Sequence, residues 1–500
     1  MIDALVLDPA DSVAVATHPV TAGDTLTLGG HPGEVMTVTA VSDVAPGHKI
    51  ALADIAEGAD VVKYGMPIGH TTADVRRGEW IHSHNLSTNL GPDLDYTFLP
   101  TDRRTLPGSG EGTFMGYRRA DGRVGIRNDL YIVPTVGCIN ALCEGILRDF
   151  TDGHTEGLPF DSTIVTRHPY GCSQLGGDLG MTQRILADIV GHPNAGGVLV
   201  IGLGCENNQM DQMRAGLGAH DPDRVRFMIA QEADDEYETG VALLEELLAA
   251  AKEDHREEVP ISELKVGVKC GGSDGFSGIT ANPLIGRFTD WLVSHGGSVV
   301  LTEVPEMFGA ETVLMSRSRD EGVFSETVDL VNGFKDYFRR YDQPIYENPS
   351  PGNKEGGITT LEEKSLGCIQ KAGTAEVEDV LAYGSTIRTP GLSLLQGPGN
   401  DLVSSSVLAS AGCQLVLFST GRGTPFGTYV PTVKVSSNTA LATRKKRWID
   451  FDGGRTMTEP MDDVLPDFIA YVTSVAGGVK TLNETHHMQE IAIFKDGVTE

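Results

Sequence analysis

Residues 269–286 read KCGGSDGFSGITANPLIG, and this stretch indicates how the chain folds. The apolar run just before it, at 264–269, predicts a strand that ends at Cys270. A turn rich in glycine, serine and aspartate follows, and the pattern then predicts a helix that begins near Thr280. A strand, a polar loop and a helix in this order place functional groups at the carboxyl edge of a parallel sheet.

The same arrangement occurs three more times upstream. LYIVPTVGC ends at Cys138, STIVTRHPYGC ends at Cys172, and GVLVIGLGC ends at Cys205, and a helical pattern follows each. Because loops at the carboxyl edge of a parallel sheet converge, we expect these three cysteines and Cys270 to lie close together. Thiolates grouped in this way bind iron, zinc or an iron–sulfur cluster. The alternative is that each cysteine is a small residue packed in a crowded loop.

The composition limits the classes of partner. The 39 basic and 69 acidic side chains give a net charge of −30, which argues against nonspecific binding to nucleic acid or to an anionic membrane. An anionic substrate would therefore need a locally basic pocket. The first 18 residues lack the basic region of a secretory signal, and no apolar run reaches the roughly 18 residues of a membrane span. The seven cysteines do not form the pattern of a disulfide framework, so we expect a cytoplasmic protein.

The order of the predicted elements indicates a multidomain α/β protein, with about 100–200 residues to a domain. Residues 1–95 are short strands broken by turns and predict a small all-β domain. Residues 96–112 are typical of a linker. Residues 113–258 and 259–500 alternate strands with helices, which predicts two α/β domains with mainly parallel sheets. The strands are expected at 129–135, 162–167, 196–202, 225–230 and 264–269, and the helices at 139–151, 179–191, 239–256, 280–295 and 322–341.

Several histidines are candidates for acid–base chemistry. His82 and His84 stand two residues apart in HSHN, so on a strand they would point to the same face and suit a metal or an anion. The alternative is that they are ordinary polar residues on an exposed edge. The other candidates for a general acid or base are His168, Lys364, Glu303 and Glu306.

Cationic and polar residues in glycine-rich loops are candidates for binding an anionic substrate, since arginine grips a carboxylate with two hydrogen bonds. The alternative is that these residues only keep the surface soluble. The substrate-binding candidates are Arg127, Ser273, Asp274, Asn282, Lys354 and Arg422.

Taken together, the sequence blocks resemble those of the altronate/galactarate dehydratase family, nearly from end to end. The N-terminal region with HSHN is similar to the SAF (β-clip) domain of that family. The remaining blocks are GYRRADGRVGIRN (116–128), HPYGCSQLGGD (168–178), VLVIGLGCENNQ (198–209), KCGGSDGFSGITANP (269–283), LTEVPEMFGAE (301–311), NPSPGNKEGGITTLEEKSLG (348–367) and FSTGRGTPFGTYVPTVK (418–434).

The resemblance implies a hydro-lyase that removes water from a sugar acid. D-altronate would give 2-dehydro-3-deoxy-D-gluconate, with Fe(2+) as the cofactor and Mn(2+) or an iron–sulfur cluster as alternatives. A related acid such as galactarate, or a sugar-acid-binding protein without catalysis, stays open. So does the choice between a monomer and a homo-oligomer, and whether HSHN closes over its own chain or a neighbour. We expect His82, His84, His168 and Lys364 to be catalytic, and Cys138, Cys172, Cys205 and Cys270 to bind the metal.

Overall fold

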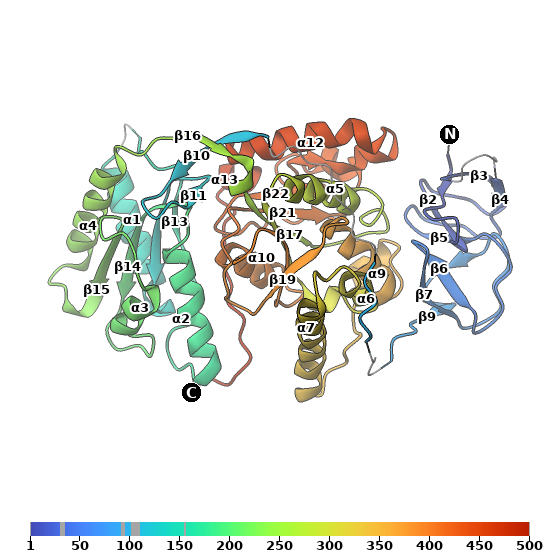
Figure 1. The fold of residues 1–500 in the computed structure, drawn as a ribbon, viewed down its shortest axis with the longest axis horizontal. Coiled ribbons are helices and arrows are strands. Elements are labelled where there is room, and N and C mark those ends of the chain that lie inside the picture. The colour runs from blue at the N-terminus through green and yellow to red at the C-terminus, as the bar shows by residue number, and fades with distance from the viewer. Residues whose placement is uncertain (1, 31–35, 92–95, 102–110, 155–156, 500) are drawn as a thin grey trace.

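The computed structural model describes residues 2–30, 36–91, 96–101, 111–154 and 157–499. Three regions follow one another along the chain. The C-terminal region lies in the middle of the molecule, with the N-terminal region at one end and the second region at the other (Figure 1). Part of the expected linker, at 102–110, lies outside the described residues.

The N-terminal region is all-β in its described part, as the sequence predicts. Alternation explains the strands: in β3, Leu26 and Leu28 are buried, whereas Thr25 is exposed and Thr27 is half-buried. A six-stranded sheet has the order β4-β3-β1-β2-β5-β8, and a three-stranded sheet has the order β6-β7-β9. The strands are β1 (Ala4–Leu5), β2 (Val13–Ala16), β3 (Thr25–Gly29), β4 (Met36–Thr39), β5 (Lys49–Ala51), β6 (Asp60–Lys63), β7 (Met66–Thr71), β8 (Trp80–Ile81) and β9 (Leu86–Ser87).

The second region is built on a four-stranded parallel sheet of order β13-β12-β14-β15. Its central strand is apolar on both faces: Leu130 and Ile132 pack with α1 and α4, whereas Tyr131 and Val133 pack with α2. The strands are β12 (Asp129–Pro134), β13 (Thr163–Val165), β14 (Ala195–Gly202) and β15 (Val225–Ile229). The helices are α1 (Asn140–Asp152), α2 (Gly176–Val190), α3 (Met210–Leu217) and α4 (Glu236–Ala251).

A small antiparallel sheet joins the start of the second region to its end. In this sheet β10 (Thr113–Arg118) pairs with β11 (Val124–Gly125) on one side and with β16 (Glu257–Pro260) on the other. The pairing brings the entry to this region and the exit from it together beside the C-terminal region.

The C-terminal region contains a seven-stranded parallel sheet of order β19-β20-β18-β17-β21-β22-β23. The strands are β17 (Lys265–Cys270), β18 (Ser298–Leu301), β19 (Val377–Leu381), β20 (Gly391–Leu395), β21 (Leu415–Thr420), β22 (Thr432–Ser436) and β23 (Phe451–Asp452). The helices are α5 (Ala281–Ser294), α6 (Glu311–Met315), α7 (Glu321–Arg340), α8 (Pro351–Glu355), α9 (Leu361–Cys368), α10 (Asp401–Ser410), α11 (Thr439–Arg444), α12 (Met461–Ala476) and α13 (Leu482–Thr485).

The expected strands and helices are confirmed to within a few residues at their ends. The long helix expected at 322–341 is α7, and the helix expected at 280–295 is α5. None of the helices in the described ranges has both the length and the apolar character needed to cross a bilayer.

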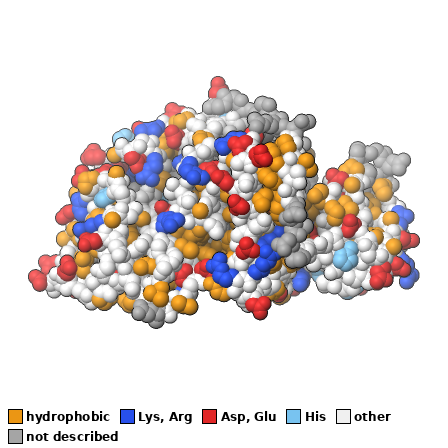
Figure 2. All heavy atoms as spheres, turned by 60° about the horizontal axis from the view of Figure 1, so that its bottom comes forward, with side chains coloured by type: hydrophobic (Ala, Val, Ile, Leu, Met, Phe, Trp, Pro, Cys, Tyr) orange, Lys and Arg blue, Asp and Glu red, His pale blue; other side chains and the backbone are white. Residues whose placement is uncertain are grey.

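The end of β17 in the seven-stranded sheet, together with the charged residues of α9, lies close to the N-terminal region. Strand β17 ends at Cys270, and α9 crosses nearby with its charged side chains buried. Strand β7 of the N-terminal region packs against α9. In the space-filling view the N-terminal region stands out as a lobe at one end of the molecule, with acidic and basic side chains scattered over the face shown (Figure 2).

Candidate functional site

Three potential metal ligands meet where β17 ends. The Sγ atoms of Cys270 and Cys368 lie 3.3 Å apart, and each lies 3.2 Å from Oε2 of Glu306. All three side chains are buried. Cys270 is the last residue of β17, Cys368 ends α9, and Glu306 lies in the 3₁₀ turn Val304–Glu306 after β18. Three separate crossovers of the sheet therefore deliver these groups to one point.

The two thiols lie within hydrogen-bond distance of each other. The hydrogen bond from Cys368 lowers the pKa of the Cys270 thiol to about 7, against the opposing effect of burial, and the same bond raises the pKa of Cys368. Near neutral pH, Cys270 is therefore partly thiolate while Cys368 keeps its proton. A thiolate is the form of cysteine that binds a metal.

Two lysines hold the carboxylate of this group in its charged form. Nζ of Lys364 lies 2.7 Å from Oε1 of Glu306. Burial works to raise the pKa of Glu306, but the charges of Lys364 and Lys371 outweigh it and lower the pKa to about 2. The cluster thus presents a carboxylate and a partial thiolate beside two ammonium groups.

A second buried ion group joins the N-terminal region to α9. Nζ of Lys49 lies 2.7 Å from Oε2 of Glu363, and Nζ of Lys63 lies 2.8 Å from Oε1 of the same carboxylate. Burial favours the neutral form of Glu363, yet the two lysines lower its pKa to about 2. Burial also lowers the pKa of Lys49 to about 8. Because both lysines come from β5 and β6, the charges of two regions meet here.

His82 lies next to this ion group, and His84 does not. Lys49 donates to Oγ1 of Thr359 at 2.7 Å, and the same oxygen lies 2.8 Å from Nδ1 of His82. Burial and the neighbouring Lys49 lower the pKa of His82 to about 4. His82 is therefore neutral near pH 7.

The expectation that His82 and His84 share one face of a strand is wrong. They lie in a turn after β8, closed by the hydrogen bond from the Asn85 amide to the His82 carbonyl at 3.0 Å. In a turn the two-residue period of a strand does not apply, so His82 is buried and His84 is exposed.

The space enclosed between the N-terminal region and the C-terminal region is small. A cavity of about 10 Å³ is lined by side chains of both regions, among them Lys63, Tyr64, Lys364 and Cys368. That volume is roughly the space for one water molecule. A larger molecule therefore does not fit in this cavity as the structure has it.

Five of the six expected substrate-binding residues gather around this cavity and the loops beside it. Ser273, Asp274 and Asn282 line the cavity. The loop of Ser273 is held by Nδ2 of Asn353, which donates to the Ser273 carbonyl at 2.8 Å and is the neighbour of Lys354. Arg422 is exposed and lies 2.9 Å from Glu355 at the end of the same short helix, α8.

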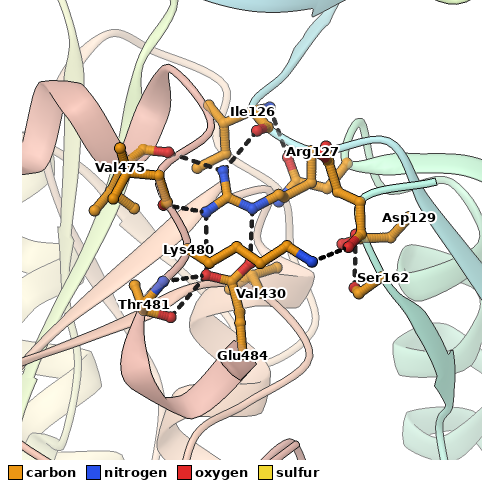
Figure 3. A network of polar contacts seen from close by, with 12 residues as sticks. Ile126, Arg127, Asp129, Ser162, Val430, Val475, Lys480, Thr481 and Glu484 are labelled. Atoms are coloured by element: carbon orange, nitrogen blue, oxygen red, sulfur yellow. Dashed lines mark hydrogen bonds and ion pairs between the residues drawn. The ribbon is translucent and has the colours of Figure 1, made fainter. Parts of the chain in front are cut away.

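Arg127, the sixth, lies elsewhere and is fully engaged. Its five N–H groups donate to both carboxylate oxygens of Glu484 and to the carbonyls of Ile126, Val475 and Val479 (Figure 3). No N–H of this guanidinium remains for a substrate. Arg127 fastens the second region to α12 and α13, and its burial is matched by Glu484 at 2.7 Å.

His168 is also held by the backbone. Nε2 lies 2.8 Å from the Pro134 carbonyl, and Nδ1 accepts from the Tyr170 amide at 3.1 Å. Burial lowers its pKa, so the ring is neutral. Both nitrogens are occupied in ordering the loops after β12 and β13.

The four strand-end cysteines do not meet at one point. Cys270 follows a strand of the C-terminal sheet, while Cys138, Cys172 and Cys205 follow three strands of the second region's sheet and are exposed. The prediction assumed one shared sheet edge, but the four strands belong to two sheets. Within the described residues, the one group of three metal-binding side chains with ligand atoms inside 4.8 Å is Cys270, Glu306 and Cys368.

Sequence reasoning left out several of these groups. It did not pair Cys368 with Cys270, and it did not select Lys49, Lys63 or Glu363. The sequence could have indicated Cys368 by its place at the end of LEEKSLGC. The structure shows that this segment is a helix whose charged residues are buried along with its apolar ones. The lysines had no signal, because each stands alone in a short strand.

The donors at Cys270 fit a divalent metal ion. Two sulfurs and one carboxylate oxygen lie close enough to share one ion. Sulfur with a single carboxylate suits iron or zinc better than magnesium or calcium. Three protein ligands also leave a coordination position for a substrate or water.

Comparison with known proteins covers almost the whole chain. Three family models match: "Altronate/galactarate dehydratase SAF domain" at 2–89, "D-galactarate dehydratase/Altronate hydrolase, second domain" at 116–252, and "D-galactarate/Altronate dehydratase, C-terminal" at 261–499. The altronate dehydratases of Bacillus subtilis (strain 168) and Escherichia coli (strain K12) are each 53% identical over 98% of both chains. The galactarate dehydratase of Escherichia coli (strain K12) is 33% identical over 88% of this chain and 87% of its own. The chain therefore belongs to the altronate/galactarate dehydratase family.

Proposed function

We propose that this chain is a hydro-lyase that removes water from D-altronate to give 2-dehydro-3-deoxy-D-gluconate. The observation that carries the proposal is 53% identity to two altronate dehydratases over 98% of the chain. The buried thiol, carboxylate and lysine cluster at the end of β17 supplies a site of suitable chemistry.

The reaction is difficult because of charge. Removing the C2 proton of a 2,3-dihydroxy carboxylate leaves a carbanion next to a carboxylate, so two negative charges lie side by side. Expelling the 3-hydroxyl as water needs a proton donor. The resulting enol then takes up a proton at C3 and becomes the 2-keto acid. The site must therefore supply positive charge, a base and an acid.

Cys270, Glu306 and Cys368 would hold a divalent ion, Fe(2+) by resemblance, with Mn(2+) as the alternative. Bound there, the ion would supply positive charge where the substrate's negative charge develops.

The side chains around the cavity take the other roles. Lys364, whose pKa is raised by Glu306 despite its burial, stays protonated and donates the proton that leaves with the 3-hydroxyl. His82 is neutral, as a base must be, and lies on the N-terminal side of the same interface. Lys63 faces the cavity from that side and offsets the substrate carboxylate. This arrangement brings two ammonium groups to the site within a chain whose overall charge is −30.

The experiment is turnover of D-altronate by the full chain after reconstitution with iron. We expect formation of the 2-keto-3-deoxy acid, and a loss of at least about 100-fold in Cys270→Ser and Cys368→Ser together with their bound iron. Cys413→Ser is the matched control, since Cys413 is an equally buried thiol of the same region. No product from the iron-loaded wild type would refute the proposal.

Galactarate is the second substrate to test, because a 33% identical relative is a galactarate dehydratase. A diacid needs a cationic anchor at each end, and Lys63, which lines the same cavity as Lys364, would be the second anchor. Side-by-side turnover of the two acids decides between them. Binding of either acid without turnover would support a sugar-acid-binding protein instead.

The domain bounds, the closure of HSHN, the cellular location and the oligomeric state remain predictions. The proposed domains are 1–95, 113–258 and 259–500, with a linker at 96–112. If HSHN closes over its own chain, the contact of His82 with Thr359 at 2.8 Å would hold it there. A cytoplasmic location fits the seven free thiols. Size measurement in solution would decide between a monomer and a homo-oligomer.

A further inference from the structure

A second cavity, of about 610 Å³, lies where the segment between α6 and α7 meets the loop before β19. Among the described residues it has no lining residue in common with the cavity at Lys364 and Cys368. Phe98, Pro100 and Val313 form apolar parts of its wall. Its volume is in the range of small-molecule sites, and none of the groups assigned to the proposed reaction lines it.

Arg317, in the lining of this cavity, has an unused edge. The residue follows α6 and is half-buried. Its Nη1 donates to the Gly373 carbonyl. Its Nε is shut off from solvent and has no hydrogen-bond partner within the described ranges, and Nη2 makes no hydrogen bond there either. Nε and Nη2 form the edge of a guanidinium that holds a carboxylate with two hydrogen bonds.

The charge of Arg317 has no carboxylate in contact with it in the part of the chain that the structure describes. The acid that acts on it is Asp290, and both oxygens of Asp290 are taken. Oδ1 accepts from the amides of Thr374 and Ala375 at 2.7 Å and 3.0 Å, and Oδ2 accepts from the Thr374 hydroxyl at 3.0 Å. Burial lowers the pKa of Arg317 to about 10, because Asp290 offsets only part of the effect. Arg317 is therefore still charged at pH 7, and an anion in the cavity would supply the missing partner.

Arg127 shows the contrast within the same molecule. Its guanidinium is buried, and it donates to both carboxylate oxygens of Glu484 (Figure 3). Arg317 has no such carboxylate among the described residues, and the open side of its guanidinium belongs to a cavity.

Ser318 adds a second donor without a partner. Its side chain is 4% exposed, and its Oγ has no hydrogen-bond partner in the described part of the chain. Strand β19 holds the backbone on both sides of it. The Val377 amide donates to the Arg317 carbonyl at 2.9 Å, and the Arg319 amide donates to the Val377 carbonyl at 3.0 Å. The two unpartnered donors thus stand on a segment that is already in place before a ligand binds.

The lining indicates the class of ligand. Its charged side chains, within the described residues, are Arg317, Arg319 and Glu376, so positive charge exceeds negative by one in a chain of net charge −30. A single excess positive charge matches a monocarboxylate better than a phosphate dianion. The apolar wall suits a ligand whose body is a ring or a short hydrocarbon.

We propose that this cavity binds a small organic carboxylate through Arg317 and Ser318, with the apolar body of the ligand against Phe98 and Val313. The site lies apart from the metal-binding group at the end of β17. The inference goes beyond the proposed function, because it does not depend on which reaction that group catalyses.

The test is calorimetric titration of the full chain with sodium benzoate, with sodium acetate and with inorganic phosphate, at an ionic strength kept constant with potassium chloride. We expect benzoate to bind with a dissociation constant on the order of 1 mM or below, and acetate and phosphate to bind at least about tenfold more weakly. Arg317→Gln and Arg317→Lys should each weaken benzoate binding at least about tenfold, because lysine keeps the charge without the two-bond edge. Ser318→Ala should weaken it by about threefold or more.

Two variants are matched controls. Arg319→Gln removes an exposed arginine of the same lining, which lies 3.0 Å from Asp320, and should change the affinity for benzoate by at most about threefold. Lys364→Gln removes a cation of the other cavity and should bind benzoate as the wild type does. Circular dichroism checks that each variant is folded, and Ser318→Ala keeps the test open if the Arg317 variants are not.

The outcomes separate this inference from the proposed function. No binding of benzoate at about 10 mM, equal affinity in Arg317→Gln and wild type, or phosphate binding more tightly than benzoate would each overturn the inference, even if D-altronate is dehydrated. Benzoate binding that depends on Arg317, with no turnover of any sugar acid, would support the inference and overturn the dehydratase.

Discussion

A buried ion group holds the N-terminal region against the C-terminal region. Glu363 bridges Lys49 and Lys63 with contacts of 2.7 Å and 2.8 Å, and none of the three is exposed. Removing one member of such a group leaves the others charged and unpaired in a place from which water is excluded. The carboxylate is the member on which both lysines depend.

We therefore expect Glu363→Gln to destabilise the chain by about 3–5 kcal/mol, measured as a lower urea midpoint of unfolding. Asp462→Asn is the control, because the contact of Arg287 with Asp462 is exposed and worth at most about 1 kcal/mol. In wild type this stabilisation is present above pH 4.5 and disappears as the pH falls toward about 2, because the folded pKa of Glu363 is below its unfolded value. Equal effects of the two substitutions would contradict the bridging role.

The burial of His192 predicts how the stability of the folded chain changes with pH. Burial lowers its pKa from 6.5 to about 3. Between these pH values the His192 ring is protonated in the unfolded chain and neutral in the folded chain. Its contribution to stability is present above pH 6.5 and is lost as the pH falls, by up to about 1.4 kcal/mol per pH unit. His192→Gln should flatten the fall of the melting temperature between pH 6.5 and pH 4.5.

His18 is the matched control with the opposite sign. The hydrogen bond to Asp3 raises its pKa, so its contribution is present below pH 6.5 and is lost as the pH rises through the folded pKa. In His18→Gln, the melting temperature should fall between pH 6.5 and pH 4.5 at least as steeply as in the wild type. Parallel curves for wild type and His192→Gln would show that this ring is not neutral in the folded chain.

Among elements, close backbone contact sets how the N-terminal region meets the C-terminal region. A Cβ at Gly275 would lie 2.1 Å from the Gly47 carbonyl oxygen, so neither backbone can stay where it is. The Gly275 amide also donates to the Gly356 carbonyl at 2.7 Å. The glycine-rich loop after β17 is therefore a docking surface as well as a loop that carries ligands.

Gly275→Ala should loosen the N-terminal region. We expect faster cleavage of that region by a protease and at least about tenfold slower turnover of D-altronate, since His82 and Lys63 move with it. Gly180→Ala in α2 meets nothing within 4 Å and is the matched control. There alanine should be neutral or stabilise by about 0.5–1 kcal/mol. Identical proteolysis of the two variants would show that the docking is not tight.

The sequence predicted these elements well where periodicity was strong. Buried parallel strands such as β12 and β14 are continuous apolar runs, and amphipathic helices such as α7 show their face in the pattern. The sequence did not predict contacts between residues that are far apart along the chain. Cys270 and Cys368 are 98 positions apart, and Lys49 and Glu363 are 314 apart, so nothing local to either residue records the pairing. The error at HSHN came from treating a turn as a strand.

At the scale of the whole molecule, the net charge works against the site. The chain carries −30 overall, yet lysines are buried where the N-terminal and C-terminal regions meet. The central position of the C-terminal region lets the second region and the N-terminal region dock on it at opposite ends (Figure 1). The parallel sheets were predictable from the sequence. The separation of the four cysteines into two sheets was not, because the order of strands in a sheet is set by long-range packing.

Salt should therefore help the substrate to bind. An anion approaching a chain of net charge −30 is repelled over about 10 Å at 0.1 M salt and farther in dilute buffer. We expect kcat/KM for D-altronate to rise a few-fold when potassium chloride is raised from about 10 to 150 mM. Sucrose at equal viscosity is the control. A fall with salt would mean that the local lysines, and not the net charge, govern the encounter.

The most direct test is the rate of 2-keto-3-deoxy acid formation from D-altronate by the iron-reconstituted wild type and by Lys364→Gln. The account predicts turnover by the wild type and a kcat lower by about 100-fold or more in the variant, with iron content unchanged. Equal kcat values in the two proteins, at equal iron content, would contradict the assignment of dehydration to the cluster at the end of β17.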